Sequence, residues 1–165
     1  MSAEVAAAVL ALLVRRRATV AVAESLTGGL IGAALTTPSG ASAAFRGGVI
    51  AYATELKARL LAVPADLLAR EGAVHPQVAA AMAAGVRGLT GATYGLAVTG
   101  VAGPDPQDGR PVGTVHLAVC GPGGEVWPRD VVLTGSREQI RKSTVREGLV
   151  LLRGVLEGEV GEHSG

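Results

Sequence analysis

The sequence predicts a single α/β domain of three layers, with helices on both faces of a mixed, partly parallel sheet. Strand-like and helix-like stretches alternate over the first two thirds of the chain, which favours parallel pairing. Two later strand-like stretches flank a glycine-rich turn at residues 121–124, a pattern typical of an antiparallel hairpin, and one long helical stretch follows. The chain has 165 residues, the length of one domain. We expect it to fold over residues 1–157 and to end in a disordered tail over residues 158–165.

The first helical stretch covers residues 3–14 and is rich in alanine, a strong helix former. It ends in Arg15, Arg16 and Arg17, whose positive charges suit the C-terminal end of a helix dipole. A secretory leader carries its positive charge before the apolar stretch, and a membrane-spanning helix needs about 20 apolar residues. The segment meets neither condition, so we expect no membrane association and interpret the three arginines as a solvated helix end.

The next stretch is the one around which the rest of the chain is organised. Its alternating, β-branched start predicts a short buried strand over residues 19–23. A polar turn containing Ser25, Gly28 and Gly29 follows, and a helix of small residues over 30–35 comes after the turn.

The remaining elements follow from periodicity and turn chemistry. A loop of small residues over 41–48 precedes a strand over 48–53 that ends near Tyr52, and Thr54 is a candidate N-cap for the next helix. Pro128 indicates that the last strand lies at an edge of the sheet or carries a bulge. The other predicted helices cover residues 55–61, 64–70, 75–89 and 137–157, and the other predicted strands cover residues 93–99, 113–120 and 125–133.

Composition limits the class of protein. Hydrophobic residues make up 48% of the chain, but aromatic residues only 2%, so the core must pack through Ala, Val and Leu. The net charge of +1 disfavours nucleic-acid binding as the main task. The single cysteine, Cys120, lies in an apolar run and excludes an internal disulfide. We therefore expect a cytoplasmic protein with a buried thiol.

Ser25 has two interpretations. A strand, a glycine-rich turn and a helix together present a hydroxyl and free backbone N–H groups at a helix N-terminus, where anions are favoured. Alternatively, Ser25 or Thr27 serves as the N-cap of the helix, a role that contributes roughly 1 kcal/mol. This segment alone leaves both interpretations open.

The predicted topology brings other polar residues close to Ser25. Ligands of open α/β sheets bind beyond the carboxyl ends of the strands, and Ser25, Tyr52 and Thr99 each close a predicted strand. Lys57 lies in the first turn of the helix after Tyr52, and a glycine-rich loop over 100–113 begins beside Thr99. Three hydroxyls and a lysine at one sheet edge favour chemistry over capping. Taken singly, Lys57 and Tyr52 would be ordinary solvated side chains.

The three histidines do not suggest a metal site or a Ser-His-Asp set. His75 precedes Pro76 at a helix start, where a turn or capping role is expected, His116 lies in a strand, and the third lies in the tail. No second histidine, cysteine or carboxylate stands at ligand spacing from His75, so we predict no metal site.

Four motifs, in order along the chain, resemble the CinA C-terminal domain family. They are AESLTGG at residues 23–29, GGVIAY at 47–52 with Lys57 five positions on, TGVAGP at 99–104 and PVGTV at 111–115. The similarity runs over about residues 5–156. Members of this family are bacterial nicotinamide-nucleotide amidohydrolases (NMN deamidases), which convert NMN and water to nicotinic acid mononucleotide and ammonia in pyridine-nucleotide salvage. Longer members carry an additional N-terminal domain similar to molybdopterin-binding proteins, to which nothing in this sequence corresponds.

The resemblance implies roles for individual residues. Ser25 matches the nucleophile of the family, and Tyr52 and Lys57 match the pair that activates it. Thr99 and Arg141 match positions associated with the substrate pocket. The resemblance also implies a homodimer and no cofactor.

The chain departs from the family pattern at two positions. Thr54 stands where most members have Asn, between the two activating residues, which puts the substrate preference in question. His75 stands where most members have a small hydroxyl residue, and we interpret this change as structural.

Amide hydrolysis by a serine requires a base, because the hydroxyl is a weak nucleophile at neutral pH. A lysine can be that base when burial lowers its pKa toward neutrality, and a tyrosine can relay the proton. We therefore expect Lys57, directly or through Tyr52, to deprotonate Ser25 for attack on the carboxamide carbon. The expected substrate-binding residues are Thr27, Gly28 and Gly29, whose N–H groups face the oxyanion, Thr99 and Gly100 in the pocket, and Arg137 and Arg141 for the substrate phosphate.

A non-catalytic function remains the alternative. The family name comes from competence, so the chain could be a nucleotide-binding or partner-binding module linked to competence or recombination. Arg137 and Arg141 would then only decorate an exposed helix face. A phosphate-binding P-loop is disfavoured, because the sequence contains no Gly-Lys-Ser/Thr pattern.

Overall fold

The computed structural model describes residues 2–158, and its helices and strands occur in the predicted order. Of the predicted disordered tail, Gly158 ends the last helix in a left-handed conformation, and residues 159–165 lie outside the described residues. The helices are α1 (Ser2–Arg15), α2 (Leu30–Thr36), α3 (Thr54–Leu61), α4 (Ala65–Glu71), α5 (Pro76–Thr90) and α6 (Arg137–Glu157), with a short 3-10 helix at Ala41–Ala43. The strands are β1 (Val20–Glu24), β2 (Phe45–Ile50), β3 (Tyr94–Gly100), β4 (Thr114–Cys120) and β5 (Val126–Val132).

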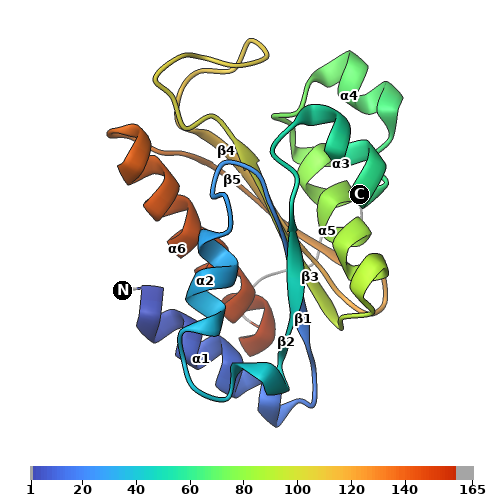
Figure 1. Ribbon diagram of the computed structural model, residues 1–165, viewed down its shortest axis with the longest axis vertical. Helices are drawn as coiled ribbons and strands as arrows, with labels where there is room; N and C mark the ends of the chain where they lie inside the picture. The colour runs from blue at the N-terminus through green and yellow to red at the C-terminus, as the bar shows by residue number, and fades with distance from the viewer. Residues whose placement is uncertain (1, 159–165) are drawn as a thin grey trace.

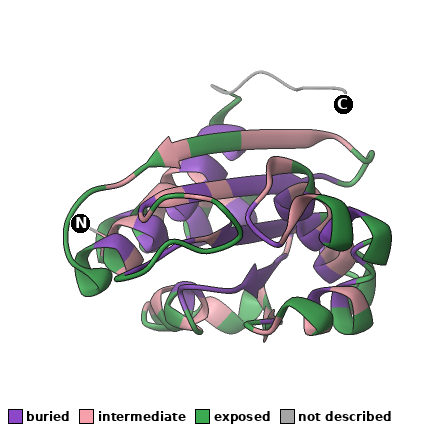
Figure 2. Ribbon diagram, turned by 90° about the horizontal axis from the view of Figure 1, so that it is seen from above, coloured by how far each residue is buried: buried purple, intermediate pink, exposed green. Residues whose placement is uncertain are grey.

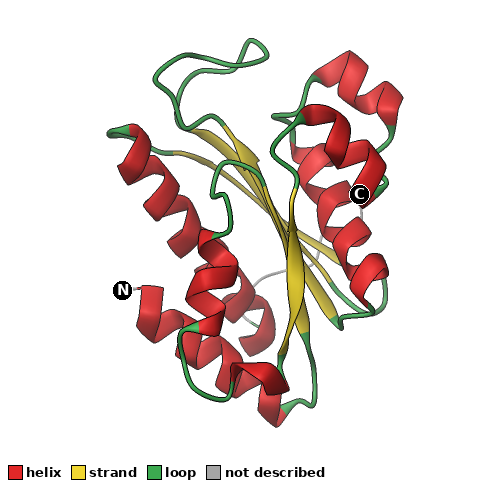
Figure 3. Cartoon of the chain, in the orientation of Figure 1, coloured by secondary structure: helices red, strands yellow, loops and turns green. Residues whose placement is uncertain are grey.

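The five strands form one mixed sheet in the order β2-β1-β3-β4-β5. Strand β1 pairs in parallel with both β2 and β3, whereas β4 is antiparallel to β3 and to β5. Figure 3 shows the sheet as the central layer between two sets of helices. The predicted α/β class, the mixed sheet and the C-terminal hairpin with its following helix are confirmed. Pro128 lies in β5, which is an edge strand as predicted.

Two apolar cores hold the three layers together. Helices α1, α2 and α6 cover one face of the sheet, and α3, α4 and α5 cover the other (Figure 1). The second core consists almost entirely of Ala, Val, Leu and Met side chains, which allow the helices to pack close to the strands. Cys120 belongs to this core and is 4% exposed, which confirms the predicted buried thiol. None of the described helices has the length and hydropathy needed to cross a membrane.

The inner strands are the buried part of the sheet. All five residues of β1 are buried, whereas every residue of β5 is half-buried or exposed (Figure 2). Ser25, which follows β1, is therefore attached to the end of a fully buried strand.

Strand β2 differs from its prediction. It begins at Phe45 instead of residue 48 and ends at Ile50, so Tyr52 lies beyond the strand. Glycine is rare in strands, and the sequence predicted a loop here for that reason. The glycine at position 48 is required by tertiary packing, because a Cβ atom there would come within 2.6 Å of the side chain of Val22. Thr54 is not the N-cap of α3 either, since Ala53 occupies that position.

The three parallel strands end at the same edge of the sheet. Ser25 follows β1, residues 51–53 follow β2, and the loop over residues 101–113 leaves β3 for β4 at this edge. Helix α2, which follows β1, lies on one face, and α5, which precedes β3, lies on the other. A crevice at the carboxyl ends of β1 and β3 is the usual ligand site of such a sheet.

Two glycines of α5 test how closely the second layer packs. A methyl group at Gly85 would overlap the carbonyl oxygen of Leu61 in α3, whereas the same group at Gly88 would meet open space. We expect Gly85→Ala to destabilise the protein by about 1–3 kcal/mol through overpacking. Gly88→Ala should stabilise it by about 0.5–1 kcal/mol, because alanine is the better helix former. Thermal unfolding of both variants measures the difference, and two equal shifts of Tm would contradict this packing.

Candidate active site

Ser25 stands in a tight turn between β1 and α2. The N–H of Gly28 donates to the carbonyl of Ser25 (3.1 Å), and the N–H of Leu30 donates to the carbonyl of Thr27 (3.0 Å). Gly28 and Gly29 have φ angles of 57° and 103°, which side chains of L-residues disfavour. The two glycines therefore allow the chain to reverse directly after Ser25, whose residue is 7% exposed.

Lys57 reaches Ser25 from the other face of the sheet. It lies in α3, is 1% exposed, and its Nζ donates to Ser25 Oγ at 3.0 Å. The same Nζ donates to the carbonyl oxygens of Ala51 (2.7 Å) and Tyr52 (3.3 Å). These carbonyls belong to the segment between β2 and α3. The amine is therefore fixed in place by three oxygen atoms with hardly any contact with water.

The environment of Lys57 favours its neutral form. Burial lowers the pKa of Lys57 from its ordinary value of 10.5 to about 8, and the negative charge of Asp108 partly opposes this shift. An amine with this pKa is a usable base near neutral pH, which an ordinary solvated lysine is not.

A small cavity lies beside Ser25. Its volume is about 100 Å³, and its walls come from the turn after β1, the segment after β2, the loop over residues 101–113 and the first turn of α6. Wider hollows of about 660 and 710 Å³ elsewhere on the surface contain neither Ser25 nor Lys57. The cavity is lined by Ser25, Leu26, Tyr52, Gly100, Val101, Ala102, Gly103, Asp105, Gln107 and Arg137.

Tyr52 and Arg137 meet at the mouth of this cavity. Arg137 donates to the hydroxyl of Tyr52 (3.2 Å) and to the carbonyl of Gly103 (2.6 Å). The phenol of Tyr52 makes no hydrogen bond to Ser25 or Lys57, and the residue is 60% exposed. The contact between Lys57 and Ser25 is thus direct, and Tyr52 contributes its backbone carbonyl to the amine.

Several of the expected substrate-binding residues do not line the cavity. The hydroxyl of Thr99 donates to the carbonyl of Ala73 (2.8 Å), and Arg141 Nε donates to the carbonyl of Leu26 (2.9 Å). Thr27 is fully buried, and its hydroxyl has no hydrogen-bond partner within the described part of the chain.

Glu24 holds the N-terminus of α2, so the alternative interpretation of Ser25 or Thr27 as the N-cap of this helix is wrong. The N-cap position belongs to Gly29. The buried Glu24 carboxylate accepts the N–H groups of Gly29 (3.2 Å), Ile31 (2.9 Å) and Gly32 (3.0 Å). The N–H groups of Gly28 and Gly29 are thus already engaged. Glu24 was missed by the sequence analysis, although a carboxylate before a glycine-rich turn and a helix is a recognisable signal.

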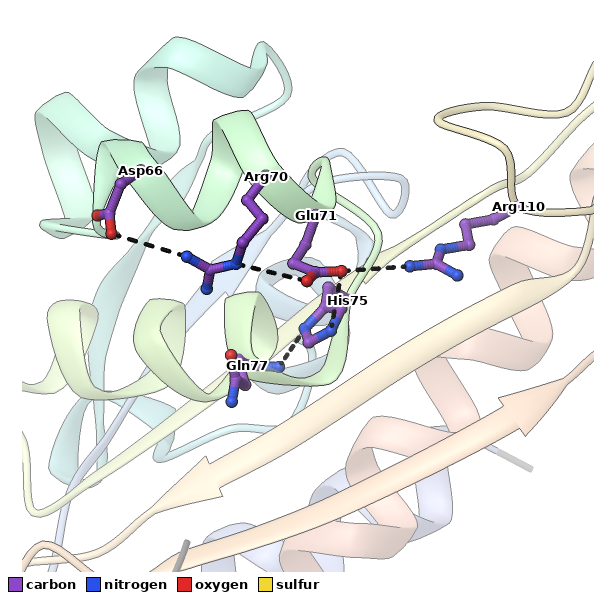
Figure 4. Close-up of polar contacts among 6 residues, drawn as sticks. All are labelled: Asp66, Arg70, Glu71, His75, Gln77 and Arg110. Atoms are coloured by element: carbon purple, nitrogen blue, oxygen red, sulfur yellow. Dashed lines mark hydrogen bonds and ion pairs between the residues drawn. The ribbon is translucent and has the colours of Figure 1, made fainter.

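The loop over residues 101–113 is fastened to the α4–α5 connection, as Figure 4 shows for one of its two contacts. Asp108 accepts the N–H of Ala73 (3.0 Å), and Arg110 lies 3.9 Å from Glu71, measured between Nη2 and Oε2. Glu71 also lies within ion-pair distance of Arg70. These contacts fix the loop that supplies Asp105 and Gln107 to the cavity, two residues without a distinctive sequence signal.

The two described histidines have structural surroundings. His75 accepts the N–H of Gln77 through Nδ1 (3.1 Å) and is the N-cap of α5, as predicted (Figure 4). His116 lies 2.7 Å from Asp130 on the neighbouring strand. Among residues 2–158, no three His, Cys, Asp or Glu side chains are grouped so as to hold a metal ion.

Comparisons with known proteins agree with this fold. A family model described as the CinA C-terminal domain matches residues 2–156. A CinA-like protein of Frankia casuarinae is 59% identical over 150 residues, which are 91% of this chain and 34% of that protein. A CinA-like protein of Synechococcus sp. is 52% identical over 90% of this chain and 36% of its own length. The chain thus spans about a third of the length of these curated relatives.

Solved structures of similar length show the same architecture. A CinA superfamily protein from Klebsiella pneumoniae superimposes with a TM-score of 0.92 at 31% identity, over 96% of this chain and 99% of that one. A competence/damage inducible protein from Agrobacterium tumefaciens gives a TM-score of 0.90 at 36% identity, over 94% and 95%.

The buried amine makes the stability of the protein depend on pH. Because the pKa of Lys57 is lower in the folded state, folding binds fewer protons, and the folded state gains stability as the pH rises from about 8 to 10.5. Relative to Lys57→Met, the wild-type protein should gain about 2 kcal/mol in its free energy of unfolding between pH 7 and pH 10. Urea unfolding at both pH values measures this gain. Lys142→Met, at the exposed Lys142 of α6, is the control: relative to this variant, the wild-type protein should show no such gain. Equal gains relative to the two variants would contradict a buried amine with a lowered pKa.

Proposed function

Because the chain belongs to the CinA C-terminal domain family, we propose that it is an amidohydrolase that converts nicotinamide mononucleotide (NMN) and water to nicotinic acid mononucleotide and ammonia. The observation that carries the proposal is the 3.0 Å contact between Lys57 Nζ and Ser25 Oγ in a nearly dry site. A nucleophile within hydrogen-bond reach of a base is the geometry that acyl transfer requires.

The backbone around Lys57 orients the base. A neutral amine has two N–H donors and one lone pair. If the two N–H groups donate to the carbonyls of Ala51 and Tyr52, the lone pair faces the hydroxyl of Ser25. The pKa of about 8 leaves about a tenth of the molecules with Lys57 neutral at pH 7.

The reaction then proceeds in two halves. Lys57 takes the proton of Ser25, and Oγ attacks the carboxamide carbon to form a tetrahedral intermediate. The C–N bond breaks as the Lys57 ammonium gives its proton to the departing nitrogen, so that ammonia leaves and the acyl group remains bound to Ser25 Oγ as an ester. A water molecule, deprotonated by Lys57, attacks the ester carbonyl, and Ser25 recovers its proton when the acid leaves.

The oxyanion requires N–H donors that are not already used. The amides of Gly28 and Gly29 donate to Ser25 and Glu24, which removes two of the three donors expected from the sequence. The third, Thr27, is fully buried and does not line the cavity. The amide of Leu26, which lines the cavity, makes no hydrogen bond within the described residues and is the donor available to the oxyanion. A donor of this kind contributes roughly 3 kcal/mol to the transition state.

The cavity supports a substrate that inserts only one end. Its volume of about 100 Å³ lies below the roughly 300 Å³ of pockets that enclose a whole ligand. The carboxamide-bearing ring would enter, and the ribose phosphate would remain outside, where Arg137 is the cation at the mouth. Asp105, also at the cavity, complements the positive charge of the pyridinium ring.

The direct test is the release of ammonia from NMN by the purified protein. We expect Ser25→Ala to lower kcat by at least about 10³-fold, because the nucleophile is lost. Ser39→Ala, in the exposed turn after α2, is the matched control and should retain full activity.

The outcomes separate the proposed enzyme from the alternative. Activity that survives in Ser25→Ala would contradict Ser25 as the nucleophile. A wild-type protein that binds NMN in calorimetry but releases no ammonia would favour the non-catalytic binding module.

The pH dependence of the reaction tests the identity of the base. The Lys57 pKa of about 8 predicts that kcat/KM for NMN rises about tenfold per pH unit below pH 8 and levels off above it. Initial rates between pH 6 and pH 9.5 measure the profile. A rate that falls between pH 7 and pH 9 would contradict a neutral amine as the base.

A further inference from the structure

Glu24 connects the two halves of the candidate active site. It is the last residue of β1, directly before Ser25, and it is 2% exposed. A buried carboxylate is costly unless hydrogen bonds satisfy its oxygens. Here Oε1 accepts the N–H groups of Gly29 and Ile31, and Oε2 accepts that of Gly32.

The side chain of Glu24 fixes the turn that carries the nucleophile. The turn runs from Ser25 to Gly29, and its far end is tied to the carboxylate that stands at its near end. Arg141 holds the middle of the turn through the carbonyl of Leu26. The loop that carries Ser25 is therefore closed on itself before any substrate arrives.

The backbone of Glu24 fixes the segment that carries the base. Its carbonyl accepts the N–H of Ala51 at 2.8 Å, one residue beyond the end of β2. The carbonyl of Ala51 in turn accepts from Lys57 Nζ at 2.7 Å. One residue thus contacts both the turn of Ser25 and Ala51, one of the acceptors of Lys57.

From these contacts we propose that Glu24 is a positioning residue, whose carboxylate holds Ser25 Oγ in hydrogen-bond contact with Lys57 Nζ. The inference rests on the proposed function only in taking Ser25 as the nucleophile. Proton transfer requires this contact, and a displacement of about 1 Å at a reacting group can lower the rate about 10²-fold. The carboxylate also occupies the N-terminus of α2, so a substrate phosphate must be bound elsewhere.

The test uses Glu24→Gln, which keeps the shape of the side chain but turns an NH₂ group toward a backbone N–H. We expect kcat for NMN to fall 10- to 100-fold with less than a threefold change in KM, because the defect lies in the alignment of Ser25. The rate of covalent labelling of Ser25 by a fluorophosphonate, followed by mass spectrometry, should fall by at least tenfold. Thr144→Val removes a buried hydrogen bond within α6 that involves no residue of the turn, and it is the matched control. Its kcat and labelling rate should equal those of the wild type.

The results distinguish this inference from the proposed function. If the wild type is labelled at Ser25 and Glu24→Gln is labelled equally fast, the role of Glu24 is overturned, while Ser25 remains the nucleophile. A wild type that is labelled at Ser25 but does not hydrolyse NMN overturns the proposed function alone, and a wild type that does neither overturns both. If Glu24→Gln fails to fold, Glu24→Asp keeps the charge but shortens the reach by one methylene. A folded Glu24→Asp protein with wild-type labelling and kcat would also overturn the inference.

Discussion

The contact between an almost dry amine and a serine hydroxyl is the constraint on which the rest of the site depends. Burying a lysine is unfavourable, and proteins retain such residues chiefly where their altered chemistry is used. Lys57 stays dry because α3 packs against α5 and because two backbone carbonyls accept hydrogen bonds from its amine. Those carbonyls lie close to the amine because only three residues separate the end of β2 from the start of α3.

The organisation of the sheet follows from the same constraint. Ser25 and the segment after β2 arrive from neighbouring parallel strands, so they end at one edge at nearly the same height. The pairing of Glu24 with Ile50 sets this register, and one further hydrogen bond, from the N–H of Ala51, continues it past the strand end. A shift of the register by one residue would reverse the faces of β2 and separate the amine from the hydroxyl.

Much of the fold was predictable because periodicity and turn chemistry are local. The apolar face of α5, the glycine turn of the hairpin and the Ser136 cap of α6 are each encoded by residues that lie close together in the sequence. The start of strand β2 was predicted too late because Gly48 is required by tertiary packing: a larger residue there would collide with Val22 of the adjacent strand. No local pattern carries that information.

The candidate site was predictable as a set of residues at one edge, but less so as a set of contacts. Topology alone brings Ser25 and Lys57 to the same place, and the resemblance to the family pointed to the same pair. The direction of a side chain depends on the hydrogen bonds that compete for it. Thr99 turns to Ala73, Arg141 turns to Leu26, and the hydroxyl of Tyr52 turns to Arg137. The sequence predicted that the N–H groups of this turn face a ligand. Glu24 accepts several of them instead, because a buried carboxylate requires hydrogen-bond partners.

The loop over residues 101–113 forms part of the cavity wall but contains neither Ser25 nor Lys57. It contributes Gly103, Asp105 and Gln107 to the cavity wall, but Ser25 comes from the turn after β1 and Lys57 from α3. Its attachment through Asp108 and Arg110 reaches the α4–α5 connection and leaves the turn of Ser25 untouched. Exchanges at Asp105 or Gln107 can therefore diversify which molecules the cavity accepts without altering the Ser25–Lys57 pair, whereas an exchange at Asp108 would also alter the pKa of Lys57.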